Sequence, residues 1–472
     1  MSAYDFIVLG GGSAGYAAAR TATDLGLKVA VVEGGKEVGG LCILRGCMPS
    51  KTLIESANRY RTLERASEFG LRAGQIGFNA AEIIARKRKL IGEFADYRCE
   101  QLESGRFTFV RGEASFLDAN TISVRNVDGS DTKLTAKSFL IATGSSISTP
   151  DIPGLQETGY LTSDDILELE HLPKSITVLG AGPVALELAH YLSSLGTKVT
   201  ILQRSAHLLK GTDPEMAKVV EKTFLTRGMK IHTNTRLLRI EKHGDLKRVI
   251  FEQEGQEYSS DTDEIFVALG RKPNIAKLNL KAADVKIEKD KVLTHSTQQT
   301  SAKNIFAAGD VCGPYEIVHI AIQQGEIAAL NAARVIQKSK GELETSDYRL
   351  KIYVVFTDPE VAVVGLSESE CTEKNIPHVS ASYPFNDHGK SLVMGEPDGF
   401  VKLVAHAKTG EILGGGVVGP HASDLIHEIV VAMAFHATAA QFAVIPHYHP
   451  TLSEIWTYPA EEICGQITPH NP

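Results

Sequence analysis

A glycine-rich turn that joins a short apolar strand to a helix occurs twice in this chain, with every position displaced by 170 residues. In such a turn the first glycine permits a tight bend, the second lets a phosphate approach the helix N-terminus, and the third lets helix and strand pack closely. The positions concerned, the last of which is an alanine, are Gly10, Gly12, Gly15, Gly180, Gly182 and Ala185. The repeat predicts two dinucleotide-binding units of the parallel, doubly wound α/β type.

The residue that ends the second strand differs between the two predicted units. Glu33, eighteen residues after Gly15, is placed to accept hydrogen bonds from an adenosine ribose. The equivalent position of the second unit is Gln203, and the cations Arg204 and Lys210 follow it. Because cations suit a ribose 2′-phosphate, we expect the second site to favour NADP(H), with NAD(H) possible. The alternative is that both cations are solvated surface charges.

The length of 472 residues predicts about three domains, and strand-ending glycines suggest their limits. Similar phrases at 141–144 and 267–270 read as closing strands of the two units, and 306–310 reads as another strand-to-glycine turn. We therefore expect the second unit to be inserted within the first. The expected domains are a first nucleotide domain at 1–150 and 271–345, a second at 151–270, and a C-terminal α+β dimerisation or interface domain at 346–472.

The C-terminal third carries no nucleotide fingerprint. An antiparallel sheet with helices fits its pattern, and such a domain often serves as an assembly surface. The expected strands are 352–356, 361–364, 399–405 and 412–418, and the expected helix is 423–434.

Cys42 and Cys47 lie five positions apart directly after the first unit. Five residues of regular helix rise by roughly 7.5 Å, whereas a disulfide needs Cα atoms within about 7 Å, so a bond here requires a distorted turn. Strain makes a disulfide easier to reduce, and Pro49 predicts a following helix whose N-terminus stabilises a thiolate. The pattern favours a redox-active pair, and the alternative is two buried, reduced cysteines. The other four cysteines have no metal-ligand spacing, so no metal site is predicted.

The charge pattern excludes several classes of partner. A net charge of -8 with mixed signs and no basic block argues against nucleic acid and gives no membrane-surface signal. No signal-peptide pattern precedes the first strand, and no apolar stretch is long enough to cross a bilayer. We therefore expect a cytoplasmic protein.

Taken together, these motifs resemble the flavin-dependent pyridine nucleotide-disulfide oxidoreductases, the family of dihydrolipoyl dehydrogenase, glutathione reductase and mercuric reductase. The resemblance covers essentially the whole chain and rests on five motifs in order. They are the first glycine turn, Cys42-x4-Cys47-x-Pro49-Ser50-Lys51, Ala142-Thr143-Gly144, Gly309-Asp310 and His449-Pro450-Thr451-Leu452-Ser453-Glu454.

The resemblance implies FAD in the first unit, with Glu33 on the adenosine ribose, Thr143 and Gly144 near the phosphates and Asp310 near the ribityl chain. It implies a nicotinamide nucleotide in the second unit. The full set of predicted cofactor contacts is Gly10, Gly12, Gly15, Glu33, Gly40, Lys51, Ala114, Thr143, Gly144, Asp310, Gly180, Gly182, Gln203, Arg204, Lys210 and Gly270.

Lys51 and Glu187 match family residues that pair beside the flavin N5. From the sequence alone, each could equally be a charge on the surface of a helix.

The resemblance also implies catalytic roles. The reduced flavin would open the disulfide through Cys47, and Cys42 would exchange with a substrate disulfide. His449 occupies the family's acid–base position and Glu454 would orient its ring. In the family this pair comes from the partner subunit, so the resemblance implies a homodimer. His447 lies close by, and only the Pro-Thr-Leu-Ser-Glu that follows His449 distinguishes the two histidines.

Within the family that the chain resembles, the substrate signal and the nucleotide signal point to different relatives. The Pro-Thr-Leu-Ser-Glu ending is the lipoamide type, and the absence of paired terminal cysteines favours a small or protein-bound organic disulfide over a metal ion. The pair Gln203-Arg204 instead resembles NADP(H)-dependent members, and Leu41 and Leu44 stand where Thr and Asn are common.

We expect an FAD-dependent NAD(P)H:disulfide oxidoreductase that is dihydrolipoyl dehydrogenase-like. One alternative is an NADPH-dependent reductase of another disulfide or of mercuric ion. The other is a non-enzymatic, flavin-bearing subunit of a multienzyme complex, and the retained cysteines, His449 and Glu454 argue against it.

Overall fold

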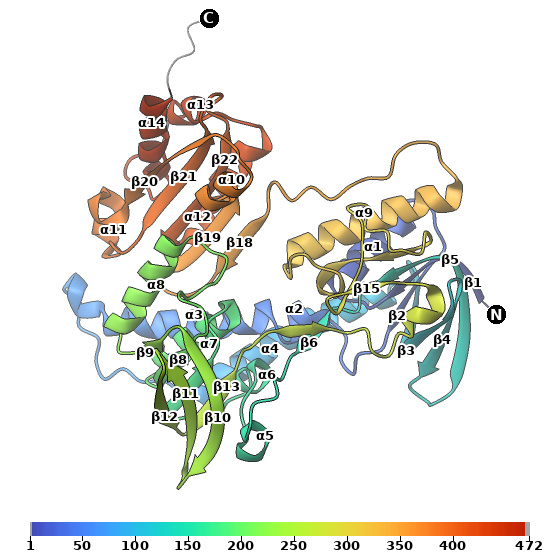
Figure 1. The fold of residues 1–472 in the computed structure, drawn as a ribbon, viewed down its shortest axis with the longest axis horizontal. Helices are drawn as coiled ribbons and strands as arrows, with labels where there is room; N and C mark the ends of the chain where they lie inside the picture. Colours follow the sequence, from blue (N-terminus) through green and yellow to red (C-terminus); the bar gives the residue numbers. More distant parts are fainter. Residues whose placement is uncertain (1, 468–472) are drawn as a thin grey trace, which may run out of the picture. The chain divides into compact units, whose positions relative to one another are not determined.

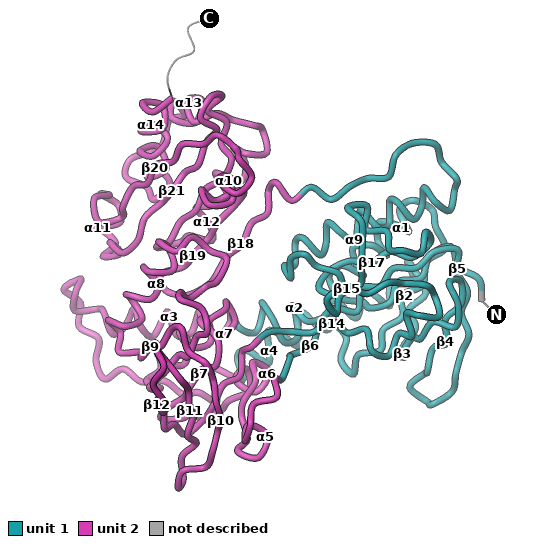
Figure 2. The backbone as a smooth tube through the Cα atoms, in the orientation of Figure 1, with its two compact units in different colours: residues 1–50, 85–149, 270–347 teal, residues 51–84, 150–269, 348–472 magenta. Residues whose placement is uncertain are grey.

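A computed structural model describes residues 2–467, and the chain divides into two compact units (Figure 2). Unit 1 comprises Met1–Ser50, Ala85–Thr149 and Gly270–Asp347, and unit 2 comprises Lys51–Ile84, Pro150–Leu269 and Tyr348–Pro472. Apart from boundary residues, the second nucleotide domain and the C-terminal domain expected from the sequence both fall within unit 2. The three-domain division stays a prediction.

Unit 1 contains a parallel sheet that continues into an antiparallel meander (Figure 1). Its strands are β1 (Ser2–Leu9), β2 (Val29–Glu33), β3 (Thr108–Asp118), β4 (Thr121–Asn126), β5 (Asp131–Ile141) and β17 (Ile305–Ala307). The parallel pairs are β1 with β2 and β5, β2 with β3, and β5 with β17. The antiparallel pairs are β3 with β4 and β4 with β5, so β3 and β5 belong to both parts of the sheet.

Both faces of the parallel sheet are covered, which explains the continuous apolar run in β1. Successive side chains point to opposite faces of a strand. Accordingly, Phe6 and Val8 join one buried cluster, and Ile7 and Leu9 join another.

The helices of unit 1 include α1 (Ser13–Asp24), α2 (Gly40–Leu44) and α9 (Val318–Gln337). The long helices α3 (Cys47–Glu64) and α4 (Ala80–Glu103) each have one part in unit 1 and one in unit 2. Unit 1 also contains the 3-10 turns η2 (Leu280–Ala283) and η3 (Gly309–Val311) and the short strands β6 (Ser145–Ile147), β14 (Arg271–Pro273), β15 (Ile287–Glu288) and β16 (Lys291–Val292). The 3-10 turn η1 (Ala66–Phe69) follows α3 and belongs to unit 2. Helices α1 and α9 pack closely, since a Cβ built on Gly325 would lie 2.3 Å from the carbonyl oxygen of Ala14.

Unit 2 contains a second parallel sheet in the order β13-β7-β8-β9. Its strands are β7 (Ser175–Leu179), β8 (Lys198–Leu202), β9 (Lys230–His232) and β13 (Glu264–Val267), and the nearby helices are α5 (Leu155–Thr158), α6 (Ser163–Ile166), α7 (Pro183–Ser194) and α8 (Pro214–Thr226). An antiparallel meander of β10 (Thr235–His243), β11 (Leu246–Gln253) and β12 (Gln256–Thr262) packs on this sheet. The contact is apolar: Val249 and Phe251 share a buried cluster with Leu179 and Leu202.

The C-terminal part of unit 2 is a five-stranded antiparallel sheet in the order β18-β19-β22-β21-β20. Its strands are β18 (Ile352–Val355), β19 (Glu360–Gly365), β20 (His378–Pro384), β21 (Phe400–His406) and β22 (Ile412–Gly419). Its helices are α10 (Glu368–Glu373), α11 (Gly389–Met394), α12 (Ala422–Ala434), α13 (Ala439–Ala443) and α14 (Thr457–Gln466), with 3-10 turns η4 (Phe385–Asp387) and η5 (Ser453–Trp456). The four expected strands and the expected helix are confirmed. Strand β20 was not predicted, because it is a half-exposed edge strand of mixed polarity.

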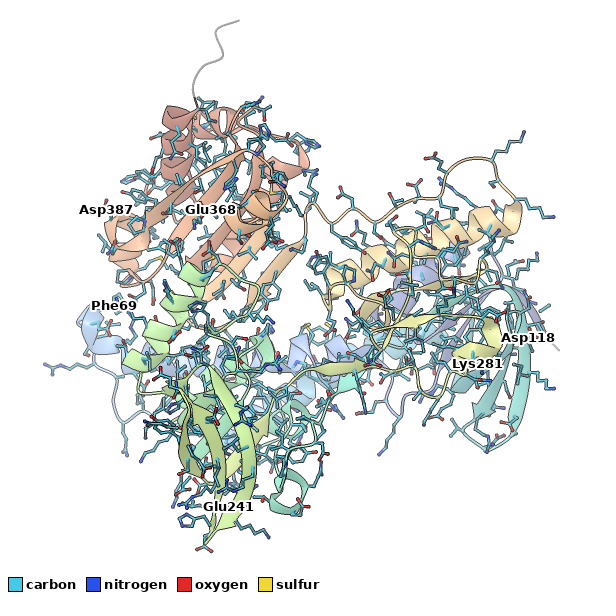
Figure 3. All side chains as sticks on the ribbon, viewed as in Figure 1. Phe69, Asp118, Glu241, Lys281, Glu368 and Asp387 are labelled. Carbon is cyan, nitrogen blue, oxygen red and sulfur yellow. The ribbon has the colours of Figure 1, made fainter. Side chains whose placement is uncertain are left out.

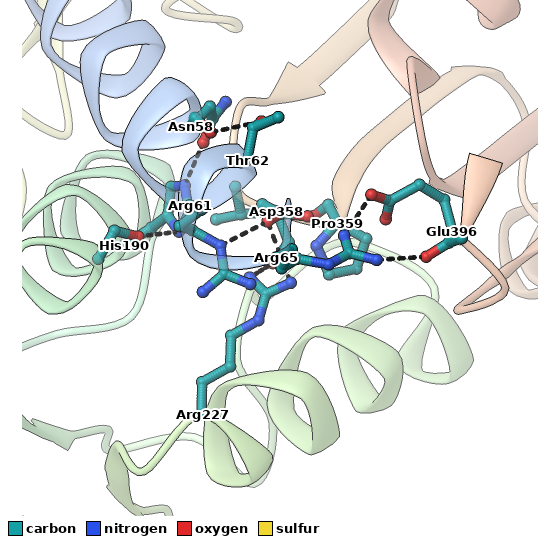
Figure 4. A network of polar contacts seen from close by, with 12 residues as sticks. Asn58, Arg61, Thr62, Arg65, His190, Arg227, Asp358, Pro359 and Glu396 are labelled. Carbon is teal, nitrogen blue, oxygen red and sulfur yellow. Dashed lines mark hydrogen bonds and ion pairs between the residues drawn. The ribbon is translucent and has the colours of Figure 1, made fainter. Parts of the chain in front are cut away.

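A network of ion pairs joins α3 and α8 to the C-terminal part of unit 2 (Figure 4). Arg61 Nε and Arg227 Nη2 lie 3.1 and 3.0 Å from the same oxygen of Asp358. Burial works to raise the pKa of Asp358, but Arg227 and Arg61 hold it below its ordinary value. Removing Asp358 would leave the two partly buried arginines without their shared counter-charge.

Among the residues described, no helix is both long and apolar enough to cross a bilayer.

Candidate active site

The two glycine turns have the same backbone conformation. Gly10 and Gly180 both have φ of +105°, a left-handed value that favours glycine. A Cβ on Gly10 would lie 2.4 Å from the carbonyl oxygen of Ala142, and one on Gly180 would lie 2.6 Å from that of Ala268. The repeat found in the sequence is therefore a structural repeat.

The start of α1 is shaped to receive a phosphate group. Its N-cap is Gly12, and no side chain among the described residues caps it. Helix α2 begins close by, since a Cβ on Gly40 would lie 2.6 Å from the Cα of Gly12. Unsatisfied backbone amides with no side chains between the two helix starts fit the pyrophosphate of a dinucleotide.

Glu33 lies at the end of β2 beside this turn, as predicted. Its Oε2 accepts a hydrogen bond from the Gly11 amide at 2.8 Å, and its Oε1 accepts one from the Gly35 amide at 2.6 Å. A carboxylate has about four acceptor sites, so the oriented group retains capacity for ribose hydroxyls. Ala114 lies in β3 next to Glu113, which packs against Gly34.

The turn at Thr143 and Gly144 is held by a segment that the motifs did not include. Thr143 Oγ1 donates to the Asn274 carbonyl at 2.8 Å, and Asn274 Nδ2 donates to the Thr143 carbonyl at 3.0 Å. The Asn274 amide also donates to the carbonyl of Gly144 at 2.9 Å. The sequence feature that could have identified Asn274 is its position shortly after Gly270, the glycine that ends the second unit's closing strand.

Asp310 takes part in a small polar chain with two residues that sequence reasoning missed. Ser145 Oγ donates to Asp310 Oδ2 at 2.6 Å, and Arg271 Nε donates to Ser145 Oγ at 2.8 Å. Burial raises the pKa of the Asp310 carboxyl, while the Ser145 hydrogen bond opposes that change. Ser145 and Arg271 each follow a turn glycine, which is the pattern that could have identified them.

The cysteine pair spans a break between two helices. Helix α2 ends at Leu44 and α3 begins at Cys47. At the break, a Cβ on Gly46 would lie 3.2 Å from the Cα of Cys42, so the chain folds back onto that residue. Both cysteines are partly exposed. The chain between them departs from a regular helix, as a bond between them would require, and Cys47 lies at the helix N-terminus as predicted. The redox-active disulfide stays a prediction.

A cation that belongs to no motif lies near Cys42. Arg98 of α4 stacks over the Tyr16 ring, with its guanidinium carbon 4.1 Å from the ring centroid. Its Nε is buried and has no hydrogen-bond partner among the described residues. Burial lowers the pKa of Arg98, and charge on Tyr16 or Cys42 raises it. The sequence contained no signal for this residue beyond an arginine within a helix.

Lys51 and Glu187 form an ion pair within unit 2, with Nζ 2.7 Å from Oε2. The other Glu187 oxygen accepts the Phe356 amide at 3.0 Å, and the Lys51 ammonium lies 4.6 Å from the centre of the Phe356 ring. The Glu187 side chain is 5% exposed, so it is no surface charge. The pairing matches the resemblance, and its role beside a flavin stays a prediction.

The second nucleotide turn also fits its ligand. Helix α7 begins after Gly182, and a Cβ on that residue would meet no described protein atom within 4 Å. Protein packing therefore does not require glycine there, whereas close approach of a pyrophosphate does. Gly270, with φ of +113°, ends the segment that follows β13.

The predicted 2′-phosphate residues have different surroundings. The side chain of Gln203 is buried and turned into its own loop, where Nε2 donates to the His207 carbonyl at 3.3 Å. Arg204 and Lys210 are both exposed, and neither forms an ion pair with any residue that the structure describes. Both cations are thus available to a ligand.

The C-terminal histidines differ clearly in environment. His449 Nδ1 lies 3.0 Å from Glu454 Oε2, and its side chain is 79% exposed. His447 is 7% exposed, with Nε2 2.6 Å from a Glu428 oxygen and Nδ1 2.9 Å from the Ile445 carbonyl. His447 therefore has a structural environment, whereas His449 presents an oriented ring to solvent. A third histidine missed by sequence reasoning, His388, lies against Glu454.

Comparison with known proteins agrees with this geometry. Residues 4–325 match the family model for pyridine nucleotide-disulphide oxidoreductases, and residues 352–460 match the dimerisation domain of that family. A mercuric reductase of Staphylococcus aureus is 36% identical over 437 residues, which cover 92% of this chain and 78% of that protein. A dihydrolipoyl dehydrogenase of Geobacillus stearothermophilus is 35% identical over 461 residues, which cover 97% of this chain and 96% of that protein.

Among solved structures, LpdA from Mycobacterium tuberculosis superposes with a TM-score of 0.86 and 28% identity, covering 97% of this chain and 99% of that one. These matches confirm the family resemblance and the fold class expected from the sequence. The chain belongs to the pyridine nucleotide-disulphide oxidoreductases, and it is an FAD-dependent enzyme that uses a pyridine nucleotide.

Proposed function

We propose that this enzyme is a dihydrolipoyl dehydrogenase-like disulfide oxidoreductase that favours NADP(H). The observation that carries the proposal is the His449–Glu454 pair, an exposed imidazole oriented by a buried carboxylate. An acid–base group near neutral pH is what thiol–disulfide exchange requires.

The FAD site is formed by the turn at Gly10–Gly15, Glu33, Gly40, the Thr143–Gly144 turn and Asp310. When bound, FAD supplies the relay that takes hydride from the nicotinamide nucleotide and passes electrons to the disulfide. Helix α3 places its N-terminus at Cys47, where the helix dipole stabilises a thiolate. Lys51 and Glu187, by resemblance, set the charge beside the flavin N5.

The remaining steps belong to the thiols and the histidine. The Cys42 thiolate attacks one sulfur of the substrate disulfide, and the partner subunit's His449 protonates the thiolate that leaves. The Cys47 thiolate then attacks Cys42 in the mixed disulfide. This step releases the second substrate thiol and re-forms the Cys42–Cys47 bond, so two electrons pass from the protein to the substrate.

A homodimer follows from the matched dimerisation domain and from the exposed apolar surface near His449. Val431 and Phe435 at the end of α12, and Val444 and Tyr448 beyond α13, are all exposed. Large exposed apolar side chains gathered in one segment indicate a protein interface. The exposed ring of His449 follows directly after Tyr448, so dimerisation at this surface would carry it toward the partner.

Reduction of mercuric ion by NADPH is the second candidate function. The 36% identity to a mercuric reductase favours it, and the exposed Arg204 and Lys210 suit NADPH in either case. The relatives do not support the non-enzymatic alternative. Docking of the dimer onto a multienzyme complex is compatible with the leading proposal.

The first experiment compares kcat/KM for NADH and NADPH, with oxidised lipoamide and then mercuric ion as acceptors. We expect turnover of lipoamide with NADPH. The Cys47→Ser variant should keep FAD and lose disulfide reduction, because the resolving thiolate is gone. Full activity in that variant would contradict the mechanism, and turnover with mercuric ion alone would favour the second candidate.

Arg204 provides the test of nucleotide choice. Arg204→Glu should lower kcat/KM for NADPH by roughly tenfold or more, because it removes a charge-assisted contact and adds repulsion, with little change for NADH. Lys242→Glu makes the same charge change at an exposed site on β10 and serves as the control. Equal losses with both nucleotides would remove Arg204 from the 2′-phosphate site.

A further inference from the structure

The carboxylate of Glu454 faces two imidazoles. Its Oε2 lies 3.0 Å from His449 Nδ1, and its Oε1 lies 3.4 Å from His388 Nε2. The His388 side chain is fully buried. Its Nε2 has no hydrogen bond of good geometry within the described part of the chain. The ring of His388 also interacts with the backbone of Thr451, an acceptor that adds to the effect of the Glu454 carboxylate. A buried imidazole nitrogen this close to a carboxylate oxygen is suited to donate to it.

Ser391 is the hydrogen-bond partner of the other ring nitrogen of His388. His388 Nδ1 lies 2.8 Å from Ser391 Oγ, at the start of α11, and both side chains are buried. When the serine hydroxyl donates to Nδ1, the proton of the neutral ring is on Nε2 and faces Glu454. Burial lowers the pKa of His388, which favours this neutral form.

The surroundings of His388 contain few competing charges. Burial lowers the pKa of His388 most, Glu454 and a hydrogen bond to the backbone of Thr451 raise it, and His449 lowers it. The aromatic neighbours are Tyr458 of α14 and Phe385, with ring centroids 6.5 and 6.4 Å away. The adjacent Asp387, labelled in Figure 3, accepts the hydroxyl of Tyr383 at 3.0 Å.

We propose that His388 is a positioning residue for the acid–base histidine. Its Nε2–H holds one oxygen of Glu454, so the other oxygen stays directed at His449 Nδ1. This arrangement keeps the Nε2 of His449 free to exchange protons with thiols. The inference rests on the proposed function, since it gives His388 a role through His449.

The arrangement also has a consequence for pH dependence. Two rings share one carboxylate, so a proton on one ring disfavours a proton on the other. As the pH falls, protonation of His388 pulls the carboxylate toward itself and away from His449. The acid limb of the exchange rate in the wild type should therefore include a second ionisation, that of His388, whose pKa is lowered from its ordinary value by burial.

The test uses the FAD-loaded full-length enzyme and two substitutions at one position. His388→Gln keeps an N–H donor at nearly the same reach and cannot become charged, whereas His388→Leu keeps the volume without a donor. His388→Leu should lower kcat for lipoamide reduction roughly tenfold, because one hydrogen bond to a charged group is lost, and it should change KM little. His388→Gln should restore most of kcat and lose the second ionisation from the acid limb.

Equal losses in the two variants would show that only packing matters, and unchanged kcat in both would show no role, so either result overturns the proposal. Ser391→Ala gives a milder test if His388→Leu does not fold. It frees the ring to take the other tautomer and should lower kcat severalfold, and an unchanged kcat would overturn the proposal.

A double-mutant cycle separates this inference from the proposed function. With His449→Asn as background, His388→Leu should cause little further loss, because its effect passes through His449. If His449→Asn itself leaves disulfide reduction intact, the proposed function fails. If His449→Asn is inactive while His388→Leu is normal, the inference about His388 alone fails.

Discussion

At Cys42 the charge close to the sulfur comes from a residue outside every motif. Arg98 stacks on Tyr16 and interacts electrostatically with Cys42. A cation near a thiol favours the thiolate, which is the nucleophile in disulfide exchange. Burial without a hydrogen bond at Nε is costly for a guanidinium, and formation of the thiolate offsets part of that cost.

We therefore expect Arg98→Gln to make Cys42 less acidic. In the reduced enzyme, the pH midpoint for iodoacetamide modification of Cys42 should rise, because the cation that favours the thiolate is gone. Arg98→Lys should retain much of the effect. Arg106→Gln, at an exposed arginine of the same unit, is the control. Peptide mass spectrometry reads the modification, and an unchanged midpoint in Arg98→Gln would contradict the assignment.

At the scale of elements, the two glycines of the α7 turn are needed for different reasons. Gly180 has a left-handed φ and a carbonyl oxygen 2.6 Å from where its Cβ would lie. Gly182 has an extended backbone and open space around it among described atoms. The first requirement is imposed by the fold, and the second by the ligand.

The two alanine substitutions should therefore separate stability from binding. Gly180→Ala should lower the free energy of unfolding by several kcal/mol, through strain and a backbone clash. Gly182→Ala should leave the melting temperature without nucleotide nearly unchanged and weaken NADPH binding. Thermal unfolding and NADPH titration measure the two effects. If Gly182→Ala destabilised the protein as much as Gly180→Ala, the turn would be structural only.

At the scale of the whole molecule, the proposed function implies that each active site of the dimer would need both chains. The cysteine pair and the histidine of one site then come from different subunits. A subunit with defective cysteines and a subunit with a defective histidine can therefore complement each other in one dimer. A heterodimer of Cys47→Ser and His449→Asn contains one site with an intact cysteine pair and an intact histidine. Its other site carries both defects.

Mixing the two inactive variants after dissociation and reassembly should restore up to roughly half of the wild-type rate per heterodimer, because one of two sites is intact. Each variant treated alone in the same way is the control. Lipoamide reduction measures recovery, and size-exclusion chromatography confirms the dimer. No recovery from verified heterodimers would place each site within one chain.

Features that depend on residues close in sequence were predictable. The glycine turns, the flanking strands and the helix that follows the cysteines were all expected, because each follows from backbone conformation within one local segment. Strand β20 was missed, since a half-exposed edge strand carries little apolar pattern. His449 was distinguished from His447 by resemblance, and the structure adds the difference in exposure.

The sequence by itself determined the two nucleotide turns, the cysteine pair and the family, because spacing and residue type suffice for local geometry. Only the tertiary structure decided which charged groups meet. Lys51 pairs with Glu187, Arg98 stacks on Tyr16, and His388 faces Glu454, each across a long separation in the chain. Whether a charge is solvated or buried against a partner depends on which faces of distant elements pack together, and residue type alone does not specify that.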